Sequence, residues 1–504
     1  MISRPKLDDY RIVGYYTGSV TIGVGLLMAI PLITSLLRSE WSVANDFLLS
    51  GALAIAVGYA FRLVCWRPRL PGMSWMHGLV VSAFAWLVAM IVGAVPYYLS
   101  GHYASFLDST FDVMSGFTTT GLVLLQDLDH VSDGVNMWRH VITYVGGQGM
   151  VVLALTFLFS GMTSGLFKMY VGEGKDERLE PNVIHTAKAI WQISLIWLAA
   201  GTLALWLAGL AIGMQPVRAF LHGLWVFMAA WSTGGFAPQS QNILYYHSSL
   251  YEILTFILFV VGSFNFALHY AVWNGRKREI YRNIETSAMF VTVSALTAVT
   301  LIGLTRWGVY PNIMSLLRKG FYLLISGHTT TGFMTIYSRQ FALEWGDMAI
   351  LAITVAMLFG GSACSTAGGF KGLRIGIIFK ALLQDIKKMV MPESAVVVQR
   401  FHHGKDVVLT DPTVRAAMTI VVLYVATWVA GTLGGVASGY DMVSSMFEAA
   451  SVTGNVGLSD GITAPSMPAA LKVLYIAIMW AGRMEFTSVL GLGAFAVASF
   501  RRRR

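Results

Sequence analysis

The chain has 504 residues, of which 56% are hydrophobic and only 12% are charged. This composition is too apolar for a soluble protein of that length, and apolar runs of about 20 residues recur from end to end, so we expect a polytopic membrane protein. The net charge of +9 does not indicate nucleic-acid binding, because the basic residues lie in short loops between apolar runs, as the positive-inside rule describes.

Two apolar runs, at about 14–37 and 43–64, open the chain and predict a leading pair of transmembrane helices within region 1–70. The first run is longer than the apolar core of a cleaved leader peptide, and Asp8 and Asp9 precede it. We therefore expect it to be retained as a helix.

Four similar units follow, and each reads as a spanning helix, a half-helix, a polar glycine loop and a second spanning helix. In every unit an aromatic residue is followed ten positions later by the glycine that closes the loop: Phe111 and Gly121, Trp225 and Gly235, Tyr322 and Gly332, Phe447 and Gly457. Four copies in register predict four walls around one pore. The expected fold class is an all-α polytopic membrane protein with four tandem helix–pore-loop–helix repeats around a pseudo-fourfold pore, preceded by two extra transmembrane helices.

The units lie within regions 71–180, 181–283, 284–406 and 407–504, and cover about 74–160, 187–272, 287–380 and 413–500. This gives ten full spans and four re-entrant half-helices. Basic clusters occur at Arg4 to Arg11, Arg62 to Arg69, Lys168 to Lys188, Arg276 to Arg282, Lys371 to Lys405 and Arg501 to Arg504. Assigning all of them to the cytoplasm places both termini inside and the four glycine loops outside.

The half-helices begin at residues that start helices well: Ser105, Pro216, Pro311 with Asn312, and Asp441. Their carboxyl ends point at the glycine loops and carry partial negative charge, which favours a cation at the centre. Irregular backbone at this depth is tolerated only where it lines a watery cavity. We therefore expect the loops to line an ion path.

The loops have the composition of a filter that replaces the water shell of a large monovalent cation with backbone carbonyls. Glycine allows the unusual backbone angles, and threonine leaves the oxygens unobstructed. The predicted filter residues are each closing glycine and the two residues before it: Thr119, Thr120, Gly121, Thr233, Gly234, Gly235, Thr330, Thr331, Gly332, Asn455, Val456 and Gly457. By contrast, we expect Gly134 to lie in an external loop.

Two acidic residues, Asp112 and Glu448, occupy the same position in the first and fourth half-helices. A buried carboxylate is expensive, so one interpretation gives them a functional role through their field or through hydrogen bonds to the filter. The other is that they cap local amides. The sequence leaves both interpretations open.

A candidate gate interrupts the apolar helix that ends the third unit. The segment from Gly360 to Gly369 has four glycines and three hydroxyl residues, so it should unwind near mid-membrane and face the pore. Arg483 is a lone charge in the last helix, where arginine usually faces a cavity or a partner. The alternatives are that the glycines serve helix packing and that Arg483 pairs with Glu485 or a loop carbonyl. The predicted gate residues are Gly360, Gly361, Ser362, Ser365, Thr366, Gly368, Gly369 and Arg483.

With these motifs in place, nearly the whole chain resembles the Trk/Ktr/HKT superfamily of potassium transporters, and most closely its TrkH type. The resemblance rests on the four loops and on the segments GGQGMVVL (146–153), GSFNFALHY (262–270), GGSACSTAGGFK (360–371) and AGRMEF (481–486). It implies a homodimer in the bacterial inner membrane, with one pore per subunit, on a cytoplasmic ring of TrkA-like nucleotide-binding subunits. It also implies potassium as the ion at the filter residues, since all four closing residues are glycine, and a gate formed by the flexible loop and Arg483.

Several alternatives are kept. The segment 452–463 (VTGNVGLSDGIT) is closer to the sequence of KtrB subunits, and it favours a KtrB-like, sodium-dependent potassium transporter. A secondary transporter coupled to protons or sodium is a further possibility. A membrane enzyme is not expected, because the eleven histidines form no metal-spaced or catalytic set. We expect no organic cofactor and no nucleotide site in this chain. The basic stretch from Lys371 to Lys405 is a candidate surface for a partner or for membrane lipids.

Overall fold

The computed structural model describes residues 4–67, 72–149, 183–392 and 397–500. Its regular structure in these ranges is helical apart from one two-stranded antiparallel sheet. Among the described residues, six helices are long and apolar enough to span a membrane, or eight if each of two bent pairs counts as one span. The predicted all-α polytopic architecture is confirmed.

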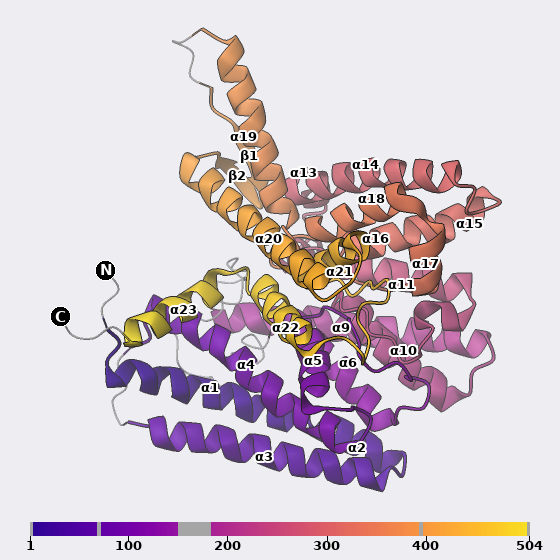
Figure 1. Ribbon diagram of the computed structural model, residues 1–504. Coiled ribbons are helices and arrows are strands. Elements are labelled where there is room, and N and C mark those ends of the chain that lie inside the picture. The colour runs from indigo at the N-terminus through magenta and orange to yellow at the C-terminus, as the bar shows by residue number, and fades with distance from the viewer. Residues whose placement is uncertain (1–3, 68–71, 150–182, 393–396, 501–504) are drawn as a thin grey trace.

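The leading pair consists of α1 (Leu7–Leu27) with its continuation α2 (Ala29–Leu37), and α3 (Trp41–Cys65). These helices lie along one edge of the molecule (Figure 1). Gly18 and Gly58 allow α1 and α3 to touch, because a Cβ on Gly18 would lie 2.5 Å from the Gly58 carbonyl oxygen.

The first helix begins at Leu7, earlier than the predicted start near residue 14. The reason is that Asp8 and Asp9 belong to its first turn, where unpaired backbone amides favour carboxylates. At the other end of the chain, Ser499 accepts a hydrogen bond of 2.6 Å from the Tyr10 hydroxyl. The start of α1 therefore lies beside the end of the last helix.

The first unit contains α4 (Trp75–Leu99), the half-helix α5 (Phe106–Phe117) and α6 (Asp133–Gln148). The rest of its predicted second span, up to about 160, lies outside the described residues. The second unit contains α9 (Val183–Ala211), the half-helix α10 (Pro216–Trp231), the short η1 (Asn242–Tyr246), α11 (Ser249–Gly262) and α12 (Phe266–Trp273).

The third unit begins with α14 (Ile284–Arg306), after the short α13 (Glu279–Arg282). Its half-helix is continuous but changes pitch, and its parts are α15 (Ile313–Ser315), the π-helical η2 (Leu316–Phe321) and α16 (Tyr322–His328). It then continues through α17 (Ser338–Glu344), α18 (Gly346–Phe359) and α19 (Gly372–Val390).

The fourth unit contains α20 (Asp411–Ala437), the half-helix α21 (Met442–Gly454), α22 (Ala469–Arg483) and α23 (Thr487–Phe500). The hairpin of β1 (Arg400–His403) and β2 (Lys405–Val408) connects it to α19, with Arg400 opposite Val408. Figure 1 shows α19 extending away from the body of the molecule, on the side opposite α1 and α3.

All four predicted half-helix starts are confirmed. Side chains of Ser105, Asn312 and Asp441 accept hydrogen bonds of 2.8 to 3.1 Å from backbone amides three residues later, and Pro216 is the first residue of α10. These caps satisfy amides that a buried helix start would otherwise leave unpaired.

In two units the second expected span is interrupted by a sharp bend. The α11–α12 pair bends by 98° and the α22–α23 pair by 113°. In the first case Asn265 starts a new helix by accepting the Ala267 amide at 2.7 Å. In the second, Glu485 and Phe486 have left-handed φ angles of 49° and 63°, which no helix can continue through.

The expectation for Gly134 is also wrong, because it lies buried in the first turn of α6. The Glu40 carboxylate accepts hydrogen bonds from the amides of Asp133 and Gly134, at 2.8 and 3.0 Å, and so pairs two amides of that helix start. A Cβ at this position would overlap the Ser35 hydroxyl.

Candidate functional site

The four glycine loops adopt one backbone conformation. The residue two before each closing glycine has a left-handed φ, although none of them is glycine: Thr119 55°, Thr233 49°, Thr330 55° and Asn455 55°. The closing glycines also have positive φ: Gly121 83°, Gly235 63°, Gly332 82° and Gly457 96°. Left-handed angles at buried non-glycine residues are costly and concentrate at functional sites.

Each loop is tied to its half-helix in the same way. The amide of the residue before the glycine donates to the carbonyl five residues earlier: Thr120 to Ser115 at 2.8 Å, Gly234 to Ala229 at 2.8 Å, Thr331 to Ser326 at 2.8 Å and Val456 to Ser451 at 2.9 Å. This bond uses one of the free carbonyls at the end of the half-helix. The four loops therefore share this backbone hydrogen bond although their sequences differ.

The closing glycines join the loops into a ring. A Cβ on Gly121 would lie 2.6 Å from the carbonyl oxygen of Gly234, in the next loop. The other three glycines would overlap a carbonyl in the same manner: Gly235 that of Thr331, Gly332 that of Val456, and Gly457 that of Thr120. Each loop thus touches the next in chain order and the fourth touches the first. The predicted arrangement of four loops around one axis is confirmed.

The carbonyls of this ring are unpaired. In the part of the chain that the structure describes, no hydrogen-bond donor reaches the carbonyls of the two residues before each closing glycine: Thr119, Thr120, Thr233, Gly234, Thr330, Thr331, Asn455 and Val456. These residues are all buried. Buried carbonyls normally have partners, so a ring of loops with unpaired carbonyls indicates a site for a cation that oxygen atoms coordinate.

Side chains around the ring differ between loops. Hydroxyl pairs brace the first and third loops, Thr118 with Thr120 at 2.7 Å and Thr329 with Thr331 at 2.9 Å. In the fourth loop Asn455 instead donates to the Thr120 hydroxyl at 3.0 Å. The asparagine that fits the threonine pattern least therefore links the fourth loop to the first.

The two acidic residues of the half-helices cap backbone amides. Asp112 accepts from the Leu124 amide at 2.8 Å and from the Tyr103 hydroxyl at 3.0 Å. Glu448 accepts from the amides of Ile462 and Thr463 at 3.2 and 3.3 Å. Of the two interpretations left open, the contacts support local capping, which holds the segments that follow the first and fourth loops.

The candidate gate is non-helical, as predicted, from residue 360 to residue 371, between α18 and α19. It inserts into the break between α11 and α12, where the Ser362 amide donates to the Ser263 carbonyl at 3.0 Å and the Phe266 amide to the Cys364 carbonyl at 3.4 Å. Backbone groups of the α11–α12 break and of the candidate gate are therefore hydrogen-bonded to each other.

The same segment lies directly against the ring. The Thr366 hydroxyl is 3.2 Å from that of Thr233, and the Gly368 amide donates to the Thr330 hydroxyl at 2.7 Å. A Cβ on Gly368 would overlap the Gly454 carbonyl. The segment thus contacts the second, third and fourth loops.

Arg483 joins the segment to the first unit. Its guanidinium donates to the Thr366 carbonyl at 2.5 Å and to the carbonyls of Gly146 and Gly147 at 2.7 and 3.2 Å. These contacts bear out the alternative of a loop-carbonyl partner for Arg483. The Glu485 carboxylate forms an ion pair with Arg374.

Sequence reasoning missed Glu285, at the start of α14. Its carboxylate accepts a hydrogen bond from the Ala363 backbone amide at 2.7 Å and another from the Asn265 side-chain amide at 3.4 Å. It therefore holds both the candidate gate and the break before α12. The signal was an acidic residue at the edge of an apolar run, which is also typical of a solvated helix end.

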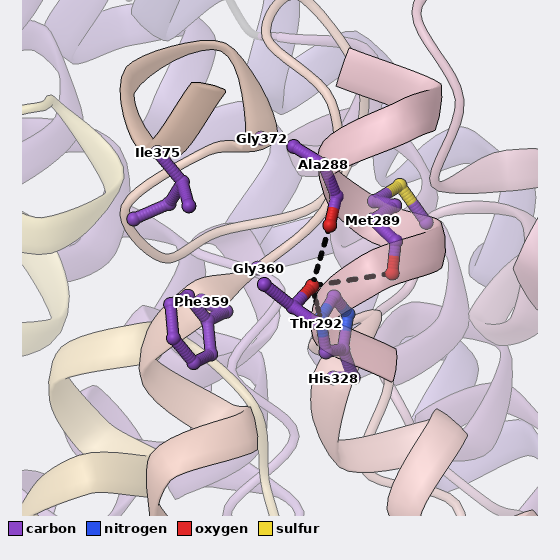
Figure 2. Close-up of a pocket in the computed structure, with 8 residues that line it drawn as sticks. All are labelled: Ala288, Met289, Thr292, His328, Phe359, Gly360, Gly372 and Ile375. Atoms are coloured by element: carbon purple, nitrogen blue, oxygen red, sulfur yellow. Dashed lines mark hydrogen bonds between the residues drawn. The ribbon is translucent and has the colours of Figure 1, made fainter. Parts of the chain in front are cut away.

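Figure 2 shows how the third loop meets the first gate residue. His328, directly before Thr329, stacks on Phe359 with ring centres 6.1 Å apart, and Phe359 precedes Gly360. The His328 ring is 2.8 Å from the Thr292 hydroxyl, which in turn donates to the Ala288 carbonyl at 2.9 Å. The end of the third half-helix thus packs against the residue that precedes the candidate gate.

Comparison with known proteins agrees with this architecture. The family model TrkH, a cation transport protein, matches residues 45–310 and 288–498. An uncharacterized cation transporter of Methanocaldococcus jannaschii is 30% identical over 98% of this chain and 97% of its own length. The Trk system potassium uptake protein TrkH of Escherichia coli is 26% identical, over 96% of this chain and 98% of its own.

A solved structure has the same fold. The crystal structure of the potassium transporter TrkH from Vibrio parahaemolyticus aligns with a TM-score of 0.80, at 24% identity, over 95% of this chain and 98% of that one. The family consists of transporters rather than enzymes. This multi-pass membrane protein therefore belongs to the TrkH family of cation transport proteins, within the superfamily that its motifs resemble.

Proposed function

We propose that the chain conducts potassium selectively across the bacterial inner membrane through the ring of glycine loops. The observation that carries the proposal is the set of buried, unpaired carbonyls in four loops that share one pattern of backbone angles and touch one another in a closed ring. A dehydrated potassium ion needs such a cage of oxygen atoms. The names of the Escherichia coli relatives, which are potassium uptake proteins, support the choice of ion.

The segment from Gly360 to Gly369 and Arg483 act as the gate in this proposal, and the arrangement described above is its closed state. Support comes from the contacts of Thr366 and Gly368 with the ring and from the guanidinium of Arg483 that holds the segment in place. Each of the regions 71–180, 181–283, 284–406 and 407–504 supplies one quarter of the pore.

The proposed assembly is a homodimer controlled by a cytoplasmic TrkA-like nucleotide-binding ring. The wording "Trk system" in the names of the relatives supports a protein of several components. Both termini are placed in the cytoplasm on the basis of the basic clusters, and the contact of Tyr10 with Ser499 agrees with ends on one side.

The test is potassium uptake by a host that lacks its own potassium uptake systems, expressing this chain with and without a TrkA-type partner. We expect uptake that requires the partner and is insensitive to external sodium and to the proton gradient. Sodium dependence would instead favour the KtrB-like alternative, and dependence on the proton gradient a coupled transporter. Absence of potassium uptake by correctly inserted protein with its partner would contradict the proposal.

A further inference from the structure

The bend between α11 and α12 borders a partly open apolar cavity of about 470 Å³. Its lining comes from α9, from the end of α11 and the bend after it, from α12 and from α13: Ile193, Trp197, Val261, Phe264, Leu268, His269, Val272, Trp273 and Ile280. The single imidazole is not free to bind a polar ligand through Nε2, because that atom lies 3.0 Å from the Val261 carbonyl oxygen. The cavity therefore suits a hydrocarbon chain.

The position of this cavity along the membrane follows from helix length. The 14 residues of α11 rise about 21 Å at 1.5 Å per residue, so the bend lies well past the middle of a hydrocarbon core about 30 Å thick. In the orientation proposed above, this is the depth of the cytoplasmic leaflet. Trp273 is 59% exposed, as is common for tryptophan at the level of the lipid headgroups.

Three basic residues lie between two residues that line the cavity. Arg276, Lys277 and Arg278 form the turn between Trp273 and Ile280, and all three side chains are exposed. Within the described residues none of the three has a carboxylate partner. The adjacent Glu279 is occupied, because its carboxylate lies 2.9 Å from the His402 ring.

We propose that this cavity and turn bind one anionic phospholipid of the cytoplasmic leaflet. An acyl chain occupies the cavity, and the phosphate lies against Arg276, Lys277 and Arg278. An apolar chain next to an anionic headgroup matches the two halves of the site, and charge complementarity favours this lipid over a zwitterionic one. The site depends on the proposed orientation but not on which cation the pore conducts.

The bound lipid would support the bent inner helix at a point that matters for the gate. The residues at the bend, Ser263 and Phe266, hydrogen-bond the gate segment through Ser362 and Cys364. A lipid packed against Val261 and Leu268 fills the outer side of the same bend. A lipid in the cavity should therefore stabilise the bend and its hydrogen bonds to the candidate gate.

The experiment is native mass spectrometry of the delipidated full chain in detergent, titrated with phosphatidylglycerol or with phosphatidylcholine of the same acyl chains. We expect one phosphatidylglycerol per subunit to bind in preference to phosphatidylcholine. The triple variant R276Q/K277Q/R278Q should weaken that binding at least about tenfold, since each basic residue contributes to attraction of anionic lipid. Val272→Trp, which fills the cavity, should weaken it while leaving the charges intact.

Two matched controls separate this site from diffuse attraction. K6Q/R67Q/R415Q removes the same charge from exposed positions outside the stretch 371–405, and Leu203→Trp adds the same ring on an exposed face of α9. Both should bind phosphatidylglycerol like the wild type. The proposal is overturned if either control loses as much binding as its partner variant, if phosphatidylcholine binds equally well, or if Val272→Trp changes the fraction of dimer and leaves lipid binding intact.

Discussion

At the scale of single residues, the closing glycines are required by both angle and space. Gly121 has a φ of 83° and lies against the Gly234 carbonyl. A side chain there must displace that carbonyl, which belongs to the proposed potassium site. We expect Gly121→Ser to lower the preference for potassium over sodium, measured as competing fluxes in reconstituted vesicles.

Gly101→Ser is the matched control for this prediction. Gly101 has a similar φ of 72°, but nothing lies within 4 Å of a Cβ built on it. The substitution therefore adds the backbone strain without the clash. Equal selectivity of the two variants would contradict the assignment of Gly121 to a filter. Gly134 is unsuitable as the control because it is buried against Ser35.

The Thr120 hydroxyl lies within hydrogen-bond distance of Thr118 and accepts from Asn455. Thr120→Ser keeps this oxygen and should retain transport, because coordination is assigned to backbone carbonyls. Thr120→Val removes it and leaves buried polar groups unpaired, which should destabilise the protein by about 1–3 kcal/mol. Thermal unfolding in detergent and potassium uptake measure the two effects. Complete loss of uptake by a normally folded Thr120→Ser protein would count against carbonyl coordination.

At the scale of elements, Arg483 is the side chain that ties the candidate gate to the first unit. Arg483→Ala removes the guanidinium that joins Thr366 to Gly146 and Gly147. We expect higher potassium flux in vesicles without the regulatory partner, and the same from a deletion within 362–367. Arg218→Ala removes an exposed arginine of α10 and should leave flux unchanged. If flux in both gate variants stays at or below that of the wild type with assembly intact, the segment only serves packing.

The β1–β2 hairpin is attached to α13 through His402. Its ring lies 2.6 Å from Asp406 and 2.9 Å from Glu279, and the hydrogen bond with Asp406 is the main cause that raises the pKa of His402 above 6.5. Because the pKa of His402 is higher in the folded state than in the unfolded state, protonated His402 stabilises the fold. This contribution is fully present below the pKa of the unfolded state and is lost as the pH rises through the pKa of the folded state. The thermal stability of His402→Asn should therefore fall less than that of the wild type between about pH 6 and pH 8.

The control for this pH effect is His247→Asn, because His247 is exposed and has a φ of 44° that asparagine tolerates. Its stability should follow the wild-type pH dependence. Identical pH profiles for wild type and His402→Asn would show that the contact with Glu279 does not depend on protonation of His402.

The sequence predicts the elements better than their bends. Periodic apolar runs and the capping residues Ser105, Asn312 and Asp441 identify the helices, because these signals are local. The bends before α12 and α23 are stabilised by partners from other units, such as Ser362, and no local pattern reports those. Glu285 could not be predicted for the same reason, because its partners Ala363 and Asn265 are distant in the sequence. The ring residues were recognisable only because the loop occurs in four copies.

At the scale of the whole molecule, ion pairs link neighbouring quarters. Lys472 of α22 donates to Asp108 of α5 at 2.6 Å, which joins the fourth unit to the first. Arg318 pairs with Glu252 at 2.6 Å, which joins the third unit to the second. The first pair is buried on both sides, whereas the Arg318 side chain is 44% exposed.

Breaking the buried pair should therefore cost more. We expect Lys472→Met to destabilise the protein by about 3–5 kcal/mol, because Asp108 is left as an uncompensated buried charge. Arg318→Met should cost clearly less, since solvent reaches that pair. Thermal unfolding of the two variants in detergent measures the difference. The double variant D108L/K472M should recover most of the loss, and a double variant as unstable as Lys472→Met would contradict a pairwise effect.

The ring of loops also has a consequence for biosynthesis. Contacts run from each loop to the next, and the last one joins Gly457 to Thr120, more than three hundred residues earlier in the chain. The ring can therefore close only after the fourth unit has been synthesised. The proposed ion site is therefore one of the last features of the fold to be completed, and a chain that ends before the fourth unit lacks one of its four sides.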